Sequence, residues 1–267
     1  MTKKIFIIGV AAFFMMFSAC KTTKKETSTI AETSITTPGK PEINETFLPQ
    51  YISKASRKIL LDGKASEADW NKSVWRPMDQ LMKGEMPSTE DFQGRYKLLW
   101  DENMIYVFAE IQDDNFIDIH PDGLDRYWDD DCLEIFVDED RSRGDHQYNY
   151  NAFAYHLSLD DKVVDIGEDQ KPAYFDDHVM ISKQRNRNMM SWEVGVKLYS
   201  DRYSDADMEA SRVKLSKGKQ IGFMVAYCDN DQSKEREHFM GDMFIPGEEK
   251  NMGWIDASVF GQLNLKE

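Results

Sequence analysis

The sequence predicts an all-β fold, namely an antiparallel β-sandwich of the jelly-roll kind with short helical insertions. From about Lys54 onward, short segments of alternating apolar and polar residues recur, which is the pattern of half-buried strands. Turn-forming residues separate these segments, and few stretches have helical spacing. Many short strands with few helices indicate two packed sheets. The chain has 267 residues, 41% of them hydrophobic, which is enough for one sizeable core.

The first 19 residues have the features of a signal peptide. Lys3 and Lys4 form a basic start, and residues 5–17 form a short apolar segment. Small residues then lead to Cys20, so that residues 17–20 (Phe-Ser-Ala-Cys) resemble a bacterial lipobox with Phe where Leu is usual. This resemblance implies cleavage before Cys20 and lipidation of its thiol and its new amino group, which anchors a protein stably. An ordinary secretory signal with an incidental cysteine is the alternative.

The anchor implies a place in the bacterial cell envelope, at the outer membrane. Residues 21–25 (Lys-Thr-Thr-Lys-Lys) lack the acidic residues that often mark export to the cell surface, so the periplasmic and the surface face both stay open. Residues 20–53 are expected to be the lipidated cysteine and a flexible tether, because they are rich in Thr and Lys and have no apolar periodicity. The folded domain is therefore expected to span residues 54–267.

The charge of the chain argues against one class of partner. Forty-eight acidic residues against 33 basic ones give a net charge of -15. Nucleic acid is bound through a basic surface, so we expect no nucleic-acid partner. The acidic balance itself identifies no partner, because such surfaces mostly serve solubility.

Several segments after residue 54 have the alternation of strands. Residues 96–100 and 104–111 flank the acidic turn 101–103, which predicts a β-hairpin. Ahead of them, residues 59–61 lead into the turn Asp62-Gly63, and Ser66 is an N-cap candidate for one or two helical turns. Further strands are expected at residues 132–137, 147–159, 179–183, 191–198, 220–227 and 261–265, with a polar and partly helical insertion at 199–215.

The stretch from Arg126 to Asp140 carries the first candidate site. Trp128 stands just before an acidic turn that runs into the expected strand 132–137. Residues 133, 135 and 137 of that strand point to one face, and residues 132, 134 and 136 to the other. Glu134 is costly to bury there unless it is paired or faces a wet groove. Trp128 near such a carboxylate indicates a place for a polar, ring-shaped ligand; a Trp that caps the core is the alternative.

Two later stretches carry further candidates. In the expected strand 147–159, Gln147, Asn149 and Asn151 alternate with larger residues and so lie along one face. Amides offer donors and acceptors, which suits sugar hydroxyls, although a solvated outer face explains them equally well. Near the C-terminus, Asn251 precedes Trp254 in a Gly-containing loop before the last expected strand.

Together these segments resemble a family 9 carbohydrate-binding module, of the kind appended to bacterial xylanases, over roughly residues 59–265. The resemblance lies in the order and spacing of several short motifs. The matching residues are Leu61-Asp62-Gly63 with Trp70, Leu99 to Asn103 with Tyr106-Val107, Trp128 to Asp131 with Glu134 to Asp138, and Trp254 with Phe260 to Leu263.

This resemblance implies a β-sandwich whose sugar site clamps a ring between two tryptophans, here Trp128 and Trp254. It implies supporting polar contacts from Glu134, Asn151 and Asn251. Asn149 stands where the family has a basic residue, so a charge-assisted contact is lost and the ligand preference is expected to differ. The implied function is non-catalytic binding of an oligo- or polysaccharide, which would help glycoside hydrolases to capture and break down polysaccharide.

Two other functions stay open. A related superfamily, the DOMON domains, includes sandwiches that bind b-type haem, which requires an axial His/Met pair facing one cavity. The 15 methionines and five histidines show no spacing that predicts such a pair. The other alternative is an envelope protein whose sandwich serves protein contacts, against which the presence of Trp128, Trp254 and Glu134 argues.

Acidic clusters, cysteines and histidines carry weaker predictions. Relatives in this family often hold structural calcium, and acidic residues gather in turns at residues 113–114, 129–131, 138–140, 229 and 231, none in an EF-hand pattern. Solvated turns are the alternative. Cys132 and Cys228 lie in expected strands and form either a disulfide or two buried free thiols. Four histidines show no metal-ligand spacing and are interpreted as ordinary polar residues, namely His146, His156, His178 and His238.

Overall fold

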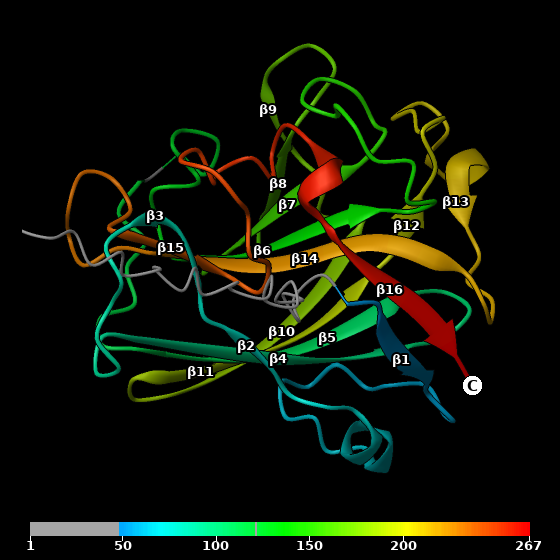
Figure 1. Cartoon of the computed structure of the whole chain (residues 1–267), viewed down its shortest axis with the longest axis horizontal. Coiled ribbons are helices and arrows are strands. Elements are labelled where there is room, and N and C mark those ends of the chain that lie inside the picture. The colour runs from blue at the N-terminus through cyan, green and yellow to red at the C-terminus, as the bar shows by residue number, and fades with distance from the viewer. Residues whose placement is uncertain (1–47, 121) are drawn as a thin grey trace, which may run out of the picture. The chain divides into compact units, whose positions relative to one another are not determined.

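Two layers of β-strands make up the part of the chain that the structure, a computed structural model, describes: residues 48–120 and 122–267 (Figure 1). The expected signal peptide 1–19, the lipidation site at Cys20 and most of the expected tether lie outside these residues. The first layer contains, in spatial order, β10 (Val179–Asn186), β11 (Met189–Val196), β5 (Ile105–Asp113) and β4 (Phe92–Trp100), with β2 (Arg76–Met78) beside β4.

The second layer lies above the first in Figure 1 and carries the candidate site. Its strands, in spatial order, are β16 (Gly261–Lys266), β14 (Gln220–Asp229), β6 (Cys132–Asp138), β7 (Phe153–Ser158), β8 (Val163–Ile166) and β9 (Pro172–Tyr174). Two more strands extend it beside β14, namely β15 (His238–Gly241) and β3 (Gln80–Gly84). Neighbouring strands within each layer are antiparallel.

One strand joins the two layers at an edge. β1 (Gln50–Lys54) pairs with β16 on one side and with β4 on the other, both in parallel. The remaining elements are short: the two-stranded sheet of β12 (Leu198–Tyr199) and β13 (Arg212–Val213), and the 3-10 turns η2 (Ala68–Lys72), η3 (Met208–Ser211) and η4 (Ala257–Val259). Among the described residues, no helix has the length and apolar character needed to cross a membrane.

The predicted all-β sandwich with short helical insertions is confirmed, and three local expectations differ. β1 begins at Gln50, upstream of the expected domain start at residue 54. η2 is capped by Glu67 without a side-chain hydrogen bond, so Ser66 is not its N-cap. Residues 147–152 form turns, and the strand expected from 147 begins only at Phe153. The amides therefore do not lie along one face of a strand.

The β4–β5 hairpin forms without a glycine because an aspartate closes its turn. Oδ1 of Asp101 accepts the backbone N–H of Asn103 at 2.7 Å and that of Met104 at 3.1 Å. This Asx arrangement replaces the backbone freedom that a glycine would supply. The hairpin pairs Trp100 with Ile105, and the whole of β5 then follows β4 in register.

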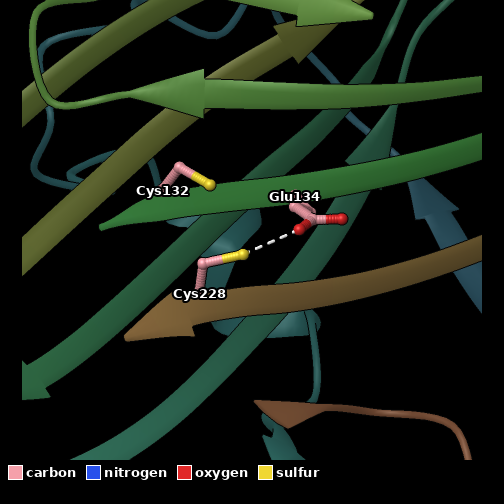
Figure 2. Close-up of side chains that lie close together, drawn as sticks. All are labelled: Cys132, Glu134 and Cys228. Carbon is pink, nitrogen blue, oxygen red and sulfur yellow. Dashed lines mark hydrogen bonds between the residues drawn. The ribbon is translucent and has the colours of Figure 1, made fainter. Parts of the chain in front are cut away.

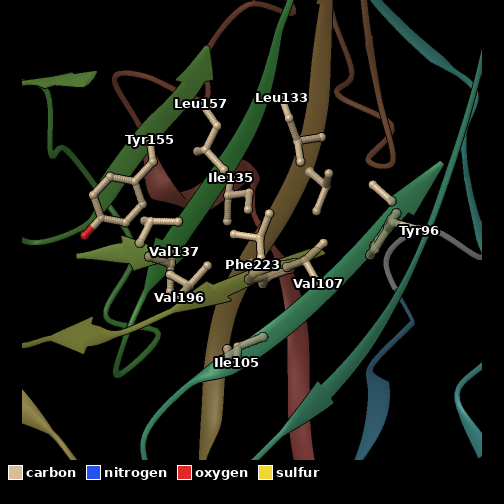
Figure 3. Close-up of a cluster of buried hydrophobic side chains, with 14 of the residues drawn as sticks. Tyr96, Ile105, Val107, Leu133, Ile135, Val137, Tyr155, Leu157, Val196 and Phe223 are labelled. Carbon is tan, nitrogen blue, oxygen red and sulfur yellow. The ribbon is translucent and has the colours of Figure 1, made fainter. Parts of the chain in front are cut away.

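The core lies between the two layers and confirms the predicted inner face of the strand at residues 132–137 (Figure 3). Leu133, Ile135 and Val137 of β6 point into it, as do Ile105 and Val107 of β5. The other face of β6 is also covered, because a second cluster of buried residues lies on the outside of the second layer. β6 is thus buried on both faces, and this places Glu134 in a largely dry environment.

A buried glutamate on the first layer explains why several of the motif residues occur together. Oε2 of Glu193 accepts the backbone N–H groups of Asp62 and Gly63, at 2.8 and 2.9 Å, and its Oε1 accepts the indole N–H of Trp70 at 3.1 Å. Gly63 has φ +79° and lies against the backbone of Lys183, where a Cβ would come within 2.9 Å of an atom. These motif residues stabilise the fold and do not form a site.

Candidate functional site

A cavity of about 290 Å³ opens on the outer face of the second layer and collects most of the predicted site residues. Strands β6 and β7 supply its floor, while β3, the segment before β15, and the loops before β6 and β16 supply its sides. Its lining consists of Lys83, Tyr127, Trp128, Glu134, His156, Ile166, Arg236, Asn251 and Trp254.

The two tryptophans predicted from the resemblance line this one cavity. Trp128 is 37% exposed and meets Tyr127 edge to face, with ring centroids 4.9 Å apart. Trp254 is partly buried against the outer cluster of apolar residues. Gly253 allows its loop to approach closely, because a Cβ there would lie 2.6 Å from Met224 and 2.8 Å from Phe136. Neither indole belongs to the core between the layers.

Glu134 sits at the base of the cavity, with three donors around one of its oxygens. Oε1 accepts the thiol of Cys228 at 2.8 Å (Figure 2) and Nη1 of Arg236 at 3.2 Å. Nε2 of His156 lies 3.1 Å from the same oxygen. No protein donor to Oε2 is recorded in the described part of the chain, and the residue lines the cavity. Oε2 is thus available to a ligand hydroxyl.

The surroundings keep Glu134 ionised. Burial raises the pKa of Glu134, but the charges of His156 and Arg236 and the hydrogen bonds to the carboxylate outweigh burial, so its pKa lies below its usual range. The other nitrogen of His156, Nδ1, lies 3.1 Å from the carbonyl oxygen of Ala154. Both ring nitrogens of His156 thus face oxygen atoms.

Of the predicted polar contacts, Asn251 lines the cavity while Asn149 and Asn151 do not. The two remaining amides bind their own turn instead. Nδ2 of Asn149 donates to the carbonyl of Asp145 at 3.3 Å, and Nδ2 of Asn151 donates to that of Arg143 at 2.8 Å. Asparagine commonly stabilises turns in this way. The family's contact from the amide strand therefore has no counterpart at these two residues.

Five lining residues, among them Ile166 of β8, carried no sequence signal for the site. Tyr127 and His156 pack edge to face, with ring centroids 4.6 Å apart, and so connect Trp128 to the base. Arg236 and Lys83 come from segments far from β6 in the sequence. His156 was interpreted as an ordinary polar residue, because its partner is a carboxylate on a neighbouring strand and not a nearby residue in the chain.

A second, more open cavity of about 520 Å³ adjoins the first. The two share Lys83 and Asn251, so the surface available to a ligand continues from one into the other. The second cavity lies between β3 and residues 248–251.

Cys132 and Cys228 are buried free thiols, which is one of the two expected outcomes. They stand directly opposite each other on β6 and β14 (Figure 2). Burial raises the pKa of both thiols, so the uncharged forms persist. Cys228 serves as a donor that helps to hold Glu134.

Away from the cavity, six aspartates converge where several strands begin or end. They form overlapping groups in which one ligand atom of each member lies within 4.8 Å of the others, the spacing that oxygens around a common Ca²⁺ adopt. The groups contain Asp91, Asp113, Asp114, Asp131, Asp229 and Asp231, and His238 joins one of them.

Several carboxylate oxygens of this acidic cluster are buried without partners. Both oxygens of Asp229 are buried without a hydrogen-bond partner, as are Oδ1 of Asp91 and Oδ1 of Asp231. Burial and the neighbouring carboxylates raise the pKa of Asp229 to about 8, and burial together with Asp113 raises that of Asp131 to about 10. An all-oxygen set of this charge fits calcium, as the resemblance implied.

The cavity gives no support to the haem alternative. Its lining contains one histidine, His156, whose two nitrogens are already engaged by Glu134 and Ala154. No methionine is among the lining residues, so the axial pair that a b-type haem needs is not formed there.

Comparison with known proteins places this geometry in context. Residues 61–267 match the family model described as "Carbohydrate family 9 binding domain-like". A family 9 carbohydrate-binding module from Caldicellulosiruptor kristjanssonii in complex with cellotriose is similar in structure, with 19% identity, a TM-score of 0.58, and coverage of 82% of this chain and 94% of that one. A module of this family from that organism in complex with glucose is also similar, with 19% identity and a TM-score of 0.58. The match covers 81% of this chain and 96% of that one. A search of curated proteins finds no match.

Proposed function

This chain belongs to the carbohydrate family 9 binding domain-like family, and from that membership we propose that its cavity binds one sugar ring between Trp128 and Trp254. Glu134 accepts a ring hydroxyl through Oε2, and Asn251 contacts the ligand at the rim. The glucose and cellotriose complexes of the similar modules support a hexose-containing saccharide as the ligand.

The single observation that carries this proposal is the meeting of two tryptophans, far apart in the chain, with an ionised carboxylate in one cavity. Sugar rings have apolar C–H faces that pack on indole, while their edges need hydrogen-bond partners. The cavity offers both kinds of surface. A core role for the tryptophans would place them between the sheets, where neither of them lies.

The energies indicate weak binding. If a sugar covers some 50–80 Å² of each indole, the apolar contribution is roughly 3 kcal/mol. Ordering the ligand costs at least about 4 kcal/mol, so stacking alone does not suffice. Hydrogen bonds to a charged group, worth about 1.5–3 kcal/mol each, therefore decide both the affinity and which hydroxyls are accepted.

Isothermal titration with glucose and cellotriose, backed by a glycan array, tests the proposal. We expect saturable binding to at least one saccharide, with a Kd of about 1 μM or weaker. Absence of binding to every saccharide on the array would refute the proposed function.

Glu134→Gln is expected to weaken saccharide binding and to destabilise the fold. The change leaves the buried Arg236 without its counter-charge, which costs about 3–5 kcal/mol in such settings. Differential scanning calorimetry measures the loss. Glu110→Gln is the matched control, because its ion pair with Arg95 is partly exposed and is worth at most about 1 kcal/mol. Equal losses in the two variants would contradict the buried network.

The role is proposed to be non-catalytic. Glycosidases generally use a pair of carboxylates, about 5–9.5 Å apart, on either side of the bond that they cleave. Glu134 is the one carboxylate in the cavity lining, and three donors already engage its Oε1. We infer that the protein supports glycoside hydrolases by holding polysaccharide and does not cleave it.

We also propose that the acidic cluster holds structural calcium. Asp229, with both oxygens buried and unpaired, would be the central ligand, and Asp91, Asp113 and Asp131 would complete the set. The ion would neutralise carboxylates whose burial and mutual repulsion otherwise raise their pKa values.

Anchoring through Cys20 is proposed from the sequence alone. Cys20→Ser removes the thiol that would be lipidated, and we expect the protein to move from the membrane fraction to the soluble fraction of cells that produce it. Incorporation of labelled fatty acid measures the modification directly. A Cys20→Ser protein that still sediments with membranes and carries label would refute the anchor.

A further inference from the structure

Arg236 carries hydrogen-bond donors that no described residue accepts. Its Nη1 donates to Oε1 of Glu134 and to Sγ of Cys228, at 3.2 and 2.8 Å. Its Nε is buried without a partner, and no acceptor for Nη2 is recorded within residues 48–120 and 122–267. Arg236 is 7% exposed and is one of the residues that line the cavity.

The unused donors lie along one edge of the guanidinium. Nε–H and one N–H of Nη2 point in the same direction, and this edge binds a carboxylate through two parallel hydrogen bonds. The plane of the group is held in place, since its central carbon lies 4.2 Å from the ring centroid of Phe239. A fixed planar edge favours a planar, doubly accepting partner over a single hydroxyl.

A second cation stands on the same side of the sheet. Lys83 on β3 lies directly opposite Phe239 on β15, so their side chains share a face, and the guanidinium of Arg236 covers that phenylalanine. Lys83 is exposed and pairs with Glu235 at 3.5 Å. Glu235 is 73% exposed, so water weakens this pair and leaves Lys83 free to bind a ligand.

The cavity is therefore cationic within an acidic protein. The chain has a net charge of -15, yet its cavity is lined by two cationic side chains, Lys83 and Arg236, against a single carboxylate, Glu134. Three donors already engage Oε1 of that carboxylate. A neutral sugar would leave the free edge of Arg236 facing only hydroxyls.

We propose that the saccharide bound here carries a carboxylate, so that the site takes a uronic acid residue. This inference rests on the proposed function and specifies its ligand class. The free edge of Arg236 binds the carboxylate, Lys83 adds its charge at the rim, and Oε2 of Glu134 accepts a ring hydroxyl away from the acid. The adjoining cavity, which shares Lys83, leaves room for the next residue of the chain.

Titration of the full protein with matched sugars tests the inference. The probes are glucuronic, galacturonic and mannuronic acid, and short oligomers of each, against glucose, galactose and mannose and their oligomers. We expect at least one uronate to bind tenfold or more tightly than its neutral counterpart, and raising NaCl from 0.05 to 0.5 M to weaken only the uronate. Neutral sugars that bind as tightly as the uronates overturn this inference alone. Absence of binding to any saccharide overturns the proposed function as well.

Two variants test whether Lys83 and Arg236 cause the preference for uronates over neutral sugars. Lys83→Gln alters an exposed side chain, and Arg236→Gln removes the free edge; each is expected to lower the ratio of uronate to neutral affinity at least threefold. Arg95→Gln removes a guanidinium from the other layer and should leave the ratio unchanged. If Arg236→Gln does not fold, Lys83→Gln still decides. A ratio that stays constant in Lys83→Gln, and in Arg236→Gln where it folds, overturns the assignment.

Discussion

Replacing Trp128 with alanine is expected to weaken saccharide binding by about thirtyfold or more while leaving the thermal midpoint almost unchanged. Truncating a tryptophan at the centre of a binding site commonly costs about 2 kcal/mol or more, which is a factor of about 30 in Kd. The stability effect is small because Trp128 is 37% exposed and lies outside the core clusters. Titration calorimetry and a thermal melt of one sample give the two numbers.

Trp254→Ala is the companion variant and should lower both the saccharide affinity and the thermal stability. Binding is expected to fall as far, but the melt should also drop, because Trp254 packs partly against the outer apolar cluster. A loss of about 1–2 kcal/mol corresponds to a shift of about 2–8 °C in a domain of this size. Tyr51→Ala, which truncates an aromatic residue that is 61% exposed on β1, is the control for both. Unchanged affinity in Trp128→Ala and Trp254→Ala would return both rings to a structural role.

Calcium is expected to raise the thermal midpoint by about 8–16 °C over protein treated with a chelator. Binding at a thousandfold excess over Kd stabilises the folded state by about 4.1 kcal/mol, and each kcal/mol shifts the midpoint by about 2–4 °C. The stabilisation arises at the acidic cluster, where both oxygens of Asp229 are buried without partners. Differential scanning fluorimetry with EDTA and with added CaCl₂ measures it.

The pH dependence gives this prediction a definite sign. In the folded chain the pKa of Asp229 is raised to about 8, against about 3.9 in an unfolded chain. A group with a raised folded pKa contributes stability that is complete below the unfolded pKa and is lost as pH rises through the folded pKa. With chelator the protein should therefore become less stable between about pH 4 and pH 8. Calcium needs the ionised carboxylates, so the calcium shift should be larger at pH 8 than at pH 5.

Asp229→Asn sharpens this experiment. Because this variant lacks the buried charge, we expect it to be more stable than the parent protein in chelator at pH 8. We also expect it to lose most of the rise in thermal midpoint that calcium causes. Asp176→Asn alters an exposed aspartate that pairs with Lys162 and is the matched control. A midpoint that is the same with calcium and with EDTA at pH 8 would show that the cluster holds no calcium important for folding.

The sequence predicted those features of the fold that depend on local alternation. The faces of β6 follow from a two-residue period, which places Leu133 and Ile135 in the core and Glu134 outside it. The β4–β5 hairpin was predicted in the same way. The parallel pairing of β1 with β16 and β4 was not, because it joins segments far apart in the chain and leaves no local pattern.

The site residues that were predicted are those that a local motif of the sequence indicates. Trp128, Glu134, Trp254 and Asn251 line the cavity, and the family resemblance had indicated all four. Asn149 and Asn151 alternate with larger residues as in a strand, but asparagine side chains also close turns through their own backbone, as they do here.

Other lining residues carry no local signal. Arg236 and His156 reach Glu134 from other strands or loops, and only the three-dimensional arrangement shows that one carboxylate gathers both. Lys83 likewise meets the site only through the pairing of β3 with β15. Neither spacing nor composition could have predicted these contacts.

The indole N–H signals of the protein report most directly on whether a sugar sits between Trp128 and Trp254. The chain has six tryptophans, and ¹H–¹⁵N spectra resolve an indole signal for each, assigned through single Trp→Phe variants. During titration with a saccharide that binds, the signals of Trp128 and Trp254 are predicted to shift together. Those of Trp70 and Trp100, whose indole N–H groups donate to Glu193 and to the carbonyl of Lys266, are predicted to stay in place. Saturable binding that moves neither the Trp128 nor the Trp254 signal would contradict the account.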